Sequence, residues 1–254
     1  MANVFMLVNY TPADASTGIT KKIRAQIHAL RRMGHSVTYT AYVDGGVAVL
    51  DNRDEQVAFT KHPIGNRKYV ALTRYALLLK NAQRYVDSGA QRFDYCYGRI
   101  SAPNARYLKF LQTLKNQGAK IVIEALSYFP GVRPKAIKSK YIAFFLNKNK
   151  KKLARVIDKF VTEGEVPDFF GIPTEKGKIG VEVDALPMHT YQGDPEELNL
   201  ITVATEREYH GYDRLVKSYL AYRASGGKAK VRIHLVGELF DSTKKMIEIG
   251  RAHV

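Results

Sequence analysis

The sequence predicts an α/β fold built around a parallel sheet, because short apolar runs alternate with amphipathic helical patterns along most of its 254 residues. The first run, Val4–Val8, is continuously apolar, as expected for a strand buried on both faces. A helical pattern over Gly18–Gly34 follows, and Ser36–Val43 is again β-rich. Strand, helix and strand together make a βαβ unit. With 45% hydrophobic residues, the chain has enough apolar side chains for a sizeable core.

The same alternation continues along the chain. Helical patterns cover Tyr69–Val86, Ala102–Asn116 and Tyr141–Ile157, and strand patterns cover Phe93–Tyr97, Lys120–Glu124 and Lys159–Thr162. We therefore expect a complete Rossmann-like domain over residues 1–165, with a parallel sheet and helices on both faces. Residues 166–196 are rich in Gly, Pro and charge, which predicts an interdomain connection.

A second alternation begins after the connection. Asn199–Ala204 and Val231–Val236 have strand patterns, and Gly211–Ala224 between them has a helical one. This predicts the beginning of a second Rossmann-like domain over residues 197–247, much shorter than the typical ~100–200 residues of a domain.

The last seven residues, 248–254, resemble the conceptual translation of a common sequencing-library adapter. We therefore expect this tail to be adapter-derived and the chain to be C-terminally truncated. The alternative is a genuine C-terminus with a chance match.

The charge balance favours an anionic partner. Lysine and arginine number 40 against 24 aspartates and glutamates, a net charge of +16. Nucleic acid, an acidic membrane face and phosphorylated substrates all fit this surplus. The single cysteine, Cys96, excludes an intramolecular disulfide and a cysteine-based zinc cluster. The N-terminus lacks the features of a signal peptide, and no apolar run reaches the ~18 residues of a membrane span. We expect a cytoplasmic protein, with peripheral attachment to the inner face of the membrane left open.

Ligands bind at loops that follow the carboxyl ends of parallel strands, and two such loops lie in the first domain. Tyr10–Gly18 leads into a helix, where Gly18 would let an anion approach free N–H groups. The alternative is that Thr17 merely caps the helix and Gly18 eases the turn. Glu124 ends a strand, where it could accept hydrogen bonds from sugar hydroxyls or act as a base. Equally, it could pair with a nearby lysine.

A third loop, Thr205–Arg214, lies in the second domain. Arg207 and His210 stand between a strand end and a helix start, where cationic groups could meet a diphosphate. The alternative is a solvated loop, with Asp213 favourable at the helix N-terminus.

A basic segment covers residues 133–155. No acidic residue occurs from Ala125 to Ile157, whereas nine lysines and arginines lie among aromatic and aliphatic side chains. Such a helix can dock on anionic lipid or bind nucleic acid. Alternatively, its aromatic residues belong to the core and its lysines to a solvated face.

Several stretches resemble family-4 glycosyltransferases of the GT-B fold, closest to the subgroup that builds capsular or extracellular polysaccharide. They occur in the family's order: Thr17–Ile19, Glu124–Pro130, Asp158–Thr162, Glu197–Ala204, His210–Leu215 and Ile233–Gly237. The resemblance implies a retaining, hexosyltransferase-type enzyme that needs no metal or other cofactor. It would transfer a sugar from a nucleotide sugar to a hydroxyl of a glycan or lipid-linked acceptor.

The resemblance also implies roles for single residues. Thr17, Gly18, Arg207 and His210 would bind the donor and Glu124 the acceptor, and no catalytic residue is assigned. The chain departs from the family at Tyr209, where the subgroup usually has Trp, and at Ile179–Glu182, where Asn-Gly-Val-Asp is expected.

The family's Glu-x7-Glu motif, which holds the donor, would lie beyond Val254, so we expect this chain alone to be inactive. The alternative function is a non-catalytic basic α/β protein that binds nucleic acid through its lysine-rich helix.

Overall fold

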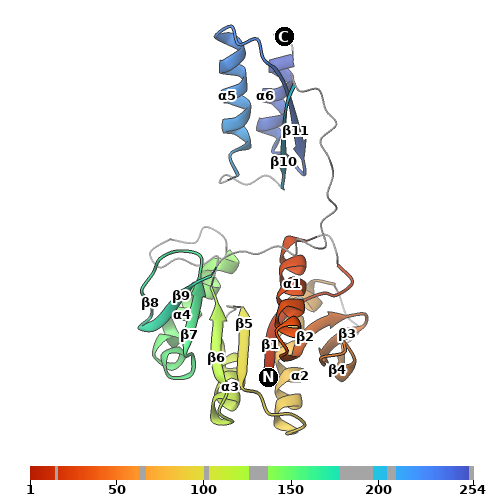
Figure 1. Ribbon diagram of the computed structural model, residues 1–254, viewed down its shortest axis with the longest axis vertical. Coiled ribbons are helices and arrows are strands. Elements are labelled where there is room, and N and C mark those ends of the chain that lie inside the picture. The colour runs from red at the N-terminus through yellow and green to blue at the C-terminus, as the bar shows by residue number, and fades with distance from the viewer. Residues whose placement is uncertain are drawn as a thin grey trace. The chain divides into compact units, whose positions relative to one another are not determined.

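The computed structural model describes residues 1–14, 17–62, 67–99, 103–125, 137–177, 197–204 and 210–251. The chain divides into two compact units, Met1–Ala185 and Leu186–Val254 (Figure 1). Each unit is described separately below.

The described residues of the first unit form a nine-stranded sheet in the order β4-β3-β2-β1-β5-β6-β7-β9-β8. The strands are β1 (Asn3–Tyr10), β2 (Ser36–Val43), β3 (Gly46–Leu50), β4 (Gln56–Lys61), β5 (Tyr95–Arg99), β6 (Lys120–Glu124), β7 (Lys159–Thr162), β8 (Asp168–Phe169) and β9 (Ile172–Lys176). Five pairs of neighbouring strands are parallel: β2–β1, β1–β5, β5–β6, β6–β7 and β7–β9. The antiparallel strands β3, β4 and β8 extend the two edges.

Helices lie on both faces of this sheet. They are α1 (Gly18–Arg32), α2 (Arg67–Asp87), α3 (Ala105–Asn116) and α4 (Ile137–Val156). Helices α2, α3 and α4 share one core with the sheet, in which Phe5, Phe110 and Phe160 are fully buried. Helix α1 covers the other face through Ile23 and Ile27, which pack over β1, β2 and β3. The predicted parallel sheet with helices on both faces is therefore confirmed.

The sheet is larger than the sequence patterns predicted. The hairpin β3–β4 continues it beyond β2, and β8 and β9 lie inside the range predicted as interdomain connection. Strands β8 and β9 are joined by a tight turn at Phe170–Gly171, where both residues have positive φ. The residues on either side of the turn, Phe169 and Ile172, are buried. Residues 168–176 thus belong to the sheet of the first unit. Most of the remaining predicted connection, 178–196, lies outside the described residues.

The second unit contains the predicted strand, helix and strand: β10 (Glu197–Val203), α5 (Tyr212–Ala224) and β11 (Lys230–Val236). The two strands pair in parallel. A further helix, α6 (Asp241–Arg251), packs against α5 and includes the first residues of the predicted adapter-derived tail. Apolar side chains on the strands, such as Ile201 and Val203, are exposed.

Candidate functional site

The strand order places a topological switch point between β1 and β5. The connection after β1 leads to β2 on one side, whereas the connection after β5 leads to β6 on the other. In open α/β sheets, ligands bind outside the carboxyl ends of the strands at such a point. Here those ends carry the loop after Tyr10, Arg99 at the end of β5 and Glu124 at the end of β6.

Glu124 is the centre of a cluster of polar side chains at this edge, and its own side chain is 3% exposed, whereas the others are partly buried. Lys22 Nζ lies 2.6 Å from Glu124 Oε1, and Gln26 Nε2 donates to the same oxygen at 3.3 Å. Arg99 Nε lies 3.2 Å from Glu124 Oε2. The two groups form an ion pair, but their orientation does not make a hydrogen bond. Gln26 also donates to the Tyr97 hydroxyl at 3.3 Å. We call these five residues the Glu124 cluster.

Three elements position the Glu124 cluster. Lys22 and Gln26 are four residues apart on α1, so their side chains lie on one face of the helix. Arg99 and Glu124 are paired residues of the neighbouring parallel strands β5 and β6. The cluster therefore depends on the packing of α1 across the sheet and not on any local sequence motif.

The Glu124 cluster carries more positive than negative charge. Lys22 and Arg99 oppose a single carboxylate, and their side chains are only 14% and 23% exposed. Burial, followed by the negative charge of Glu124, raises the pKa of the Tyr97 hydroxyl, which stays neutral. The pairing with lysine that the sequence left open for Glu124 is thus present. A carboxylate whose two oxygens face two cations is well placed to hold those cations still.

Thr17 caps α1, as one of the two interpretations of the first loop predicted. Its Oγ1 accepts the N–H of Thr20 at 3.3 Å and donates to the Thr20 hydroxyl at 2.8 Å. Gly18 does not need to be glycine for the turn, because its φ is not positive and an added Cβ would meet no described atom within 4 Å. Open space at a helix start without acidic residues in its first turn leaves room for an anion.

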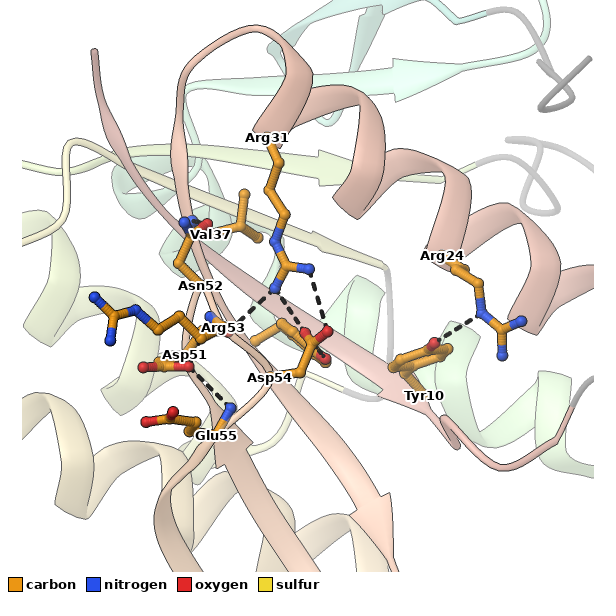
Figure 2. Close-up of polar contacts among 10 residues, drawn as sticks. Tyr10, Arg24, Arg31, Val37, Asp51, Asn52, Arg53, Asp54 and Glu55 are labelled. Atoms are coloured by element: carbon orange, nitrogen blue, oxygen red, sulfur yellow. Dashed lines mark hydrogen bonds and ion pairs between the residues drawn. The ribbon is translucent and has the colours of Figure 1, made fainter. Parts of the chain in front are cut away.

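A pocket of about 360 Å³ lies on the other side of α1, over β2 and β3. Figure 2 shows Arg24 and Arg31 reaching from α1 toward Tyr10 and Asp54. Arg31 Nη2 and the Tyr39 hydroxyl both bond Asp54 Oδ1, at 2.7 and 2.6 Å. Burial alone would raise the pKa of Asp54, but these hydrogen bonds outweigh it and lower the pKa. The contacts fasten the turn between β3 and β4 to the helix, which is a structural role.

In the second unit, the structure describes the residue before the third predicted loop, Thr205–Arg214, and the residues at the end of that loop. The Tyr212 hydroxyl donates to Ala204 O at 2.7 Å, which ties the start of α5 to the end of β10. Gly211 has a φ of +72°, where a Cβ would also lie 2.8 Å from the Arg214 guanidinium. His210 is exposed beside Tyr212, with 6.4 Å between the ring centroids. Arg207 lies outside the described residues.

The basic helix α4 has two different faces. Leu146 and Leu153 are 1% exposed and belong to the core. Phe144 is 59% exposed, with Lys148 Nζ 5.8 Å from its ring centroid. The exposed basic residues of α4 are Lys140, Lys148, Lys150, Lys151, Lys152 and Arg155. Arg133 and Lys135 of the same predicted segment lie outside the described residues.

In the part of the chain that the structure describes, there is neither a group of side chains that could bind a metal ion nor a helix that could span a membrane. No three His, Cys, Asp or Glu side chains gather there as a metal site would require. None of the described helices is both long and apolar enough to cross a bilayer.

No protein-family model matches the chain, and no curated protein matches it. Among solved structures, the apo structure of OtsA has 11% sequence identity and a TM-score of 0.50, covering 99% of this chain and 70% of its own. A UDP-N-acetylglucosamine 2-epimerase has 10% identity and a TM-score of 0.44, covering 97% and 71%. A point mutant of S. aureus TarM, in complex with UDP among other ligands, has 10% identity and a TM-score of 0.45, covering 99% and 76%.

The chain has a GT-B-like fold. This rests on the likeness to OtsA and confirms the predicted fold class. Within this fold, the structure brings Glu124 together with Lys22, Gln26 and Arg99, three residues that the sequence analysis did not select.

Proposed function

We propose that this protein is a glycosyltransferase that transfers a hexosyl group from a nucleotide sugar to a hydroxyl of a glycan or lipid-linked acceptor, with retention of configuration. The main support is a GT-B-like fold over 99% of the chain. The His210–Leu215 element at the start of α5, which resembles the polysaccharide subgroup of family 4, supports the same proposal.

On the donor side, we assign Arg207 and His210 to the diphosphate, whose negative charge grows as the bond to the sugar breaks. Thr17 and Gly18 also belong to the donor side, because the open start of α1 offers N–H groups and the positive end of a helix dipole to an anion. We expect neither a metal ion nor another cofactor, and we name no catalytic residue.

On the acceptor side, we assign Glu124. With Lys22 and Arg99 on its two oxygens, the carboxylate has a fixed orientation at the carboxyl edge of the sheet. Fixed polar groups of this kind suit hydrogen bonding to sugar hydroxyls.

The test is donor turnover by the full-length gene product. We expect a matching nucleotide sugar to release its nucleoside diphosphate only when a glycan or lipid-linked acceptor is present, with and without EDTA. The anomeric configuration of the product, read by NMR, tests retention. Salt-dependent binding to unrelated DNA, together with no effect of any nucleotide sugar on the melting temperature, would instead support the nucleic-acid-binding alternative.

We further propose that the protein works at the cytoplasmic face of the membrane, docked through α4. Phe144 is 59% exposed, and the ring contacts that the structure gives it, with Phe145 and Lys148, lie within α4 itself. An exposed aromatic ring with basic neighbours suits the boundary between anionic headgroups and acyl chains. A lipid-linked acceptor would be reached from the same surface.

Replacing Lys148, Lys150, Lys151 and Lys152 with glutamine is expected to weaken binding to anionic vesicles strongly, since each basic residue near such a surface contributes about 1 kcal/mol. Co-sedimentation with vesicles of phosphatidylglycerol and phosphatidylcholine measures the effect. A matched control replaces four exposed lysines on other elements, Lys61, Lys159, Lys176 and Lys217, with glutamine. Equal binding by both variants would assign the helix lysines to an ordinary solvated face.

A further inference from the structure

We propose that the Glu124 cluster is a binding site for an anionic group, a carboxylate or a phosphate, carried by the acceptor. The assignment to the acceptor rests on the proposed function. The anion site itself rests on the charges, burial and contacts of Lys22, Arg99 and Glu124.

The charges in the Glu124 cluster are not balanced. Two cations, more than three-quarters buried, face one carboxylate that is 3% exposed. Removing a charge from water is costly unless an opposite charge compensates it. Glu124 compensates one of the two cations, and the described residues around the cluster supply no second carboxylate within ion-pair distance of Lys22 or Arg99. A second anion from a ligand would complete the balance.

The Glu124 cluster also contains a hydrogen-bond donor that is not used. Arg99 Nη1 is buried and has no hydrogen-bond partner among the residues that the structure describes. A buried guanidinium N–H without a partner is uncommon because it loses its hydrogen bonds to water. Guanidinium groups bind carboxylates and phosphates with paired N–H donors, and such charge-assisted bonds are the stronger kind. Glu124 Oε2 has no hydrogen-bond partner either, although Arg99 Nε lies 3.2 Å from it, so the Nη1 donor is not used within the cluster. An anionic ligand oxygen is the kind of acceptor that this donor could bind.

The two cations of the Glu124 cluster are preorganised for a ligand. Lysine and arginine lose considerable side-chain freedom when they bind a ligand, which weakens binding. Here Glu124 already holds Lys22 and Arg99 on either side, and the carboxyl ends of β5 and β6 hold Arg99 and Glu124 in register. The cluster also lies at the switch point of the sheet, where ligands bind in open α/β folds. Glu124 thus orients the two cations for an incoming anion while it competes with that anion for their charge.

The experiment measures binding of inorganic phosphate and of glucuronate to the full-length gene product by calorimetry at constant ionic strength. We expect Arg99→Gln and Lys22→Gln each to weaken binding about tenfold, as expected for the loss of a charge-assisted hydrogen bond. Glu124→Gln is expected to tighten binding severalfold, because it removes the competing carboxylate and keeps a side chain of the same shape. The matched control is Lys21→Gln, an exposed lysine next to Lys22 on α1, which should leave binding unchanged.

The opposite effects of Glu124→Gln and Arg99→Gln separate a binding role from a merely structural one, in which both variants would only lower stability. Equal affinity in wild type and Arg99→Gln, or weaker binding by Glu124→Gln, would overturn the proposal. If UDP displaces phosphate, and Arg99→Gln weakens UDP binding equally, the cluster belongs to the donor and the acceptor assignment is wrong. None of these measurements needs turnover, so they stand apart from the test of transferase activity.

Discussion

Replacing Glu124 with alanine is expected to lower the free energy of unfolding of the first unit by about 3–5 kcal/mol, the usual cost of breaking a buried ion pair from one side. The carboxylate is 3% exposed, and its removal leaves Lys22 and Arg99 buried without their counter-charge. Urea unfolding of the full chain, followed by circular dichroism, measures the change. Saturating phosphate should restore part of the loss, because a ligand that binds the folded state alone stabilises it.

The matched control is Glu175→Ala on β9. Glu175 also pairs with a lysine, Lys159, at 3.0 Å, but its side chain is 64% exposed and that of Lys159 is 45% exposed. Exposed pairs of this kind contribute less than about 1 kcal/mol, since both charges stay hydrated after either is removed. Similar losses for Glu124→Ala and Glu175→Ala would show that Lys22 and Arg99 are far better hydrated than their burial indicates.

Hydrophobic periodicity predicted much of the fold correctly because the first unit is a repeated βαβ pattern. The strands Lys120–Glu124 and Lys159–Thr162 have the predicted bounds. The strands β3 and β4 were missed, although Asp44-Gly45, which joins β2 to β3, is a known hairpin signal, and Gly45 has a positive φ. The turn Phe170–Gly171 between β8 and β9 is a weaker hairpin signal. Both strands are short enough to be taken for a loop.

The candidate site was only partly predictable, because its contacts join residues far apart in the sequence. Glu124 could be selected as a carboxylate at the end of a buried strand. Its partners Lys22 and Arg99 are 102 and 25 positions earlier, as their numbers give. Arg99 could have been predicted as a partner, because Arg99 and Glu124 carry opposite charges at the ends of two strands that are neighbours in the parallel sheet. The sequence hardly indicated Lys22 as a partner, because a lysine on an amphipathic helix is usually solvated.

The loop that carries Arg207 has ends with a defined geometry. Ala204, at one end, accepts the hydrogen bond from the Tyr212 hydroxyl, and Tyr212 is 2% exposed. At the other end, Gly211 is the N-cap of α5, with a left-handed backbone, and its carbonyl oxygen accepts the N–H of Leu215 at 3.0 Å. Strand end and helix start are thus held together next to the positive end of the α5 dipole, which favours an anion although Asp213 lies in the first turn.

Replacing Arg207 with alanine in the full-length gene product is therefore expected to reduce donor turnover by about 10²–10³, the usual cost of losing one group that stabilises developing negative charge. His210→Ala should have a smaller effect, because a neutral imidazole supplies one hydrogen bond and no charge. The matched control is Arg214→Ala, which removes an exposed arginine of α5 seven residues away and should retain most activity. Steady-state rates with saturating donor measure all three variants, and circular dichroism checks that each is folded. A wild-type rate for Arg207→Ala, or an equal loss in Arg214→Ala, would contradict a specific role of Arg207 at the diphosphate.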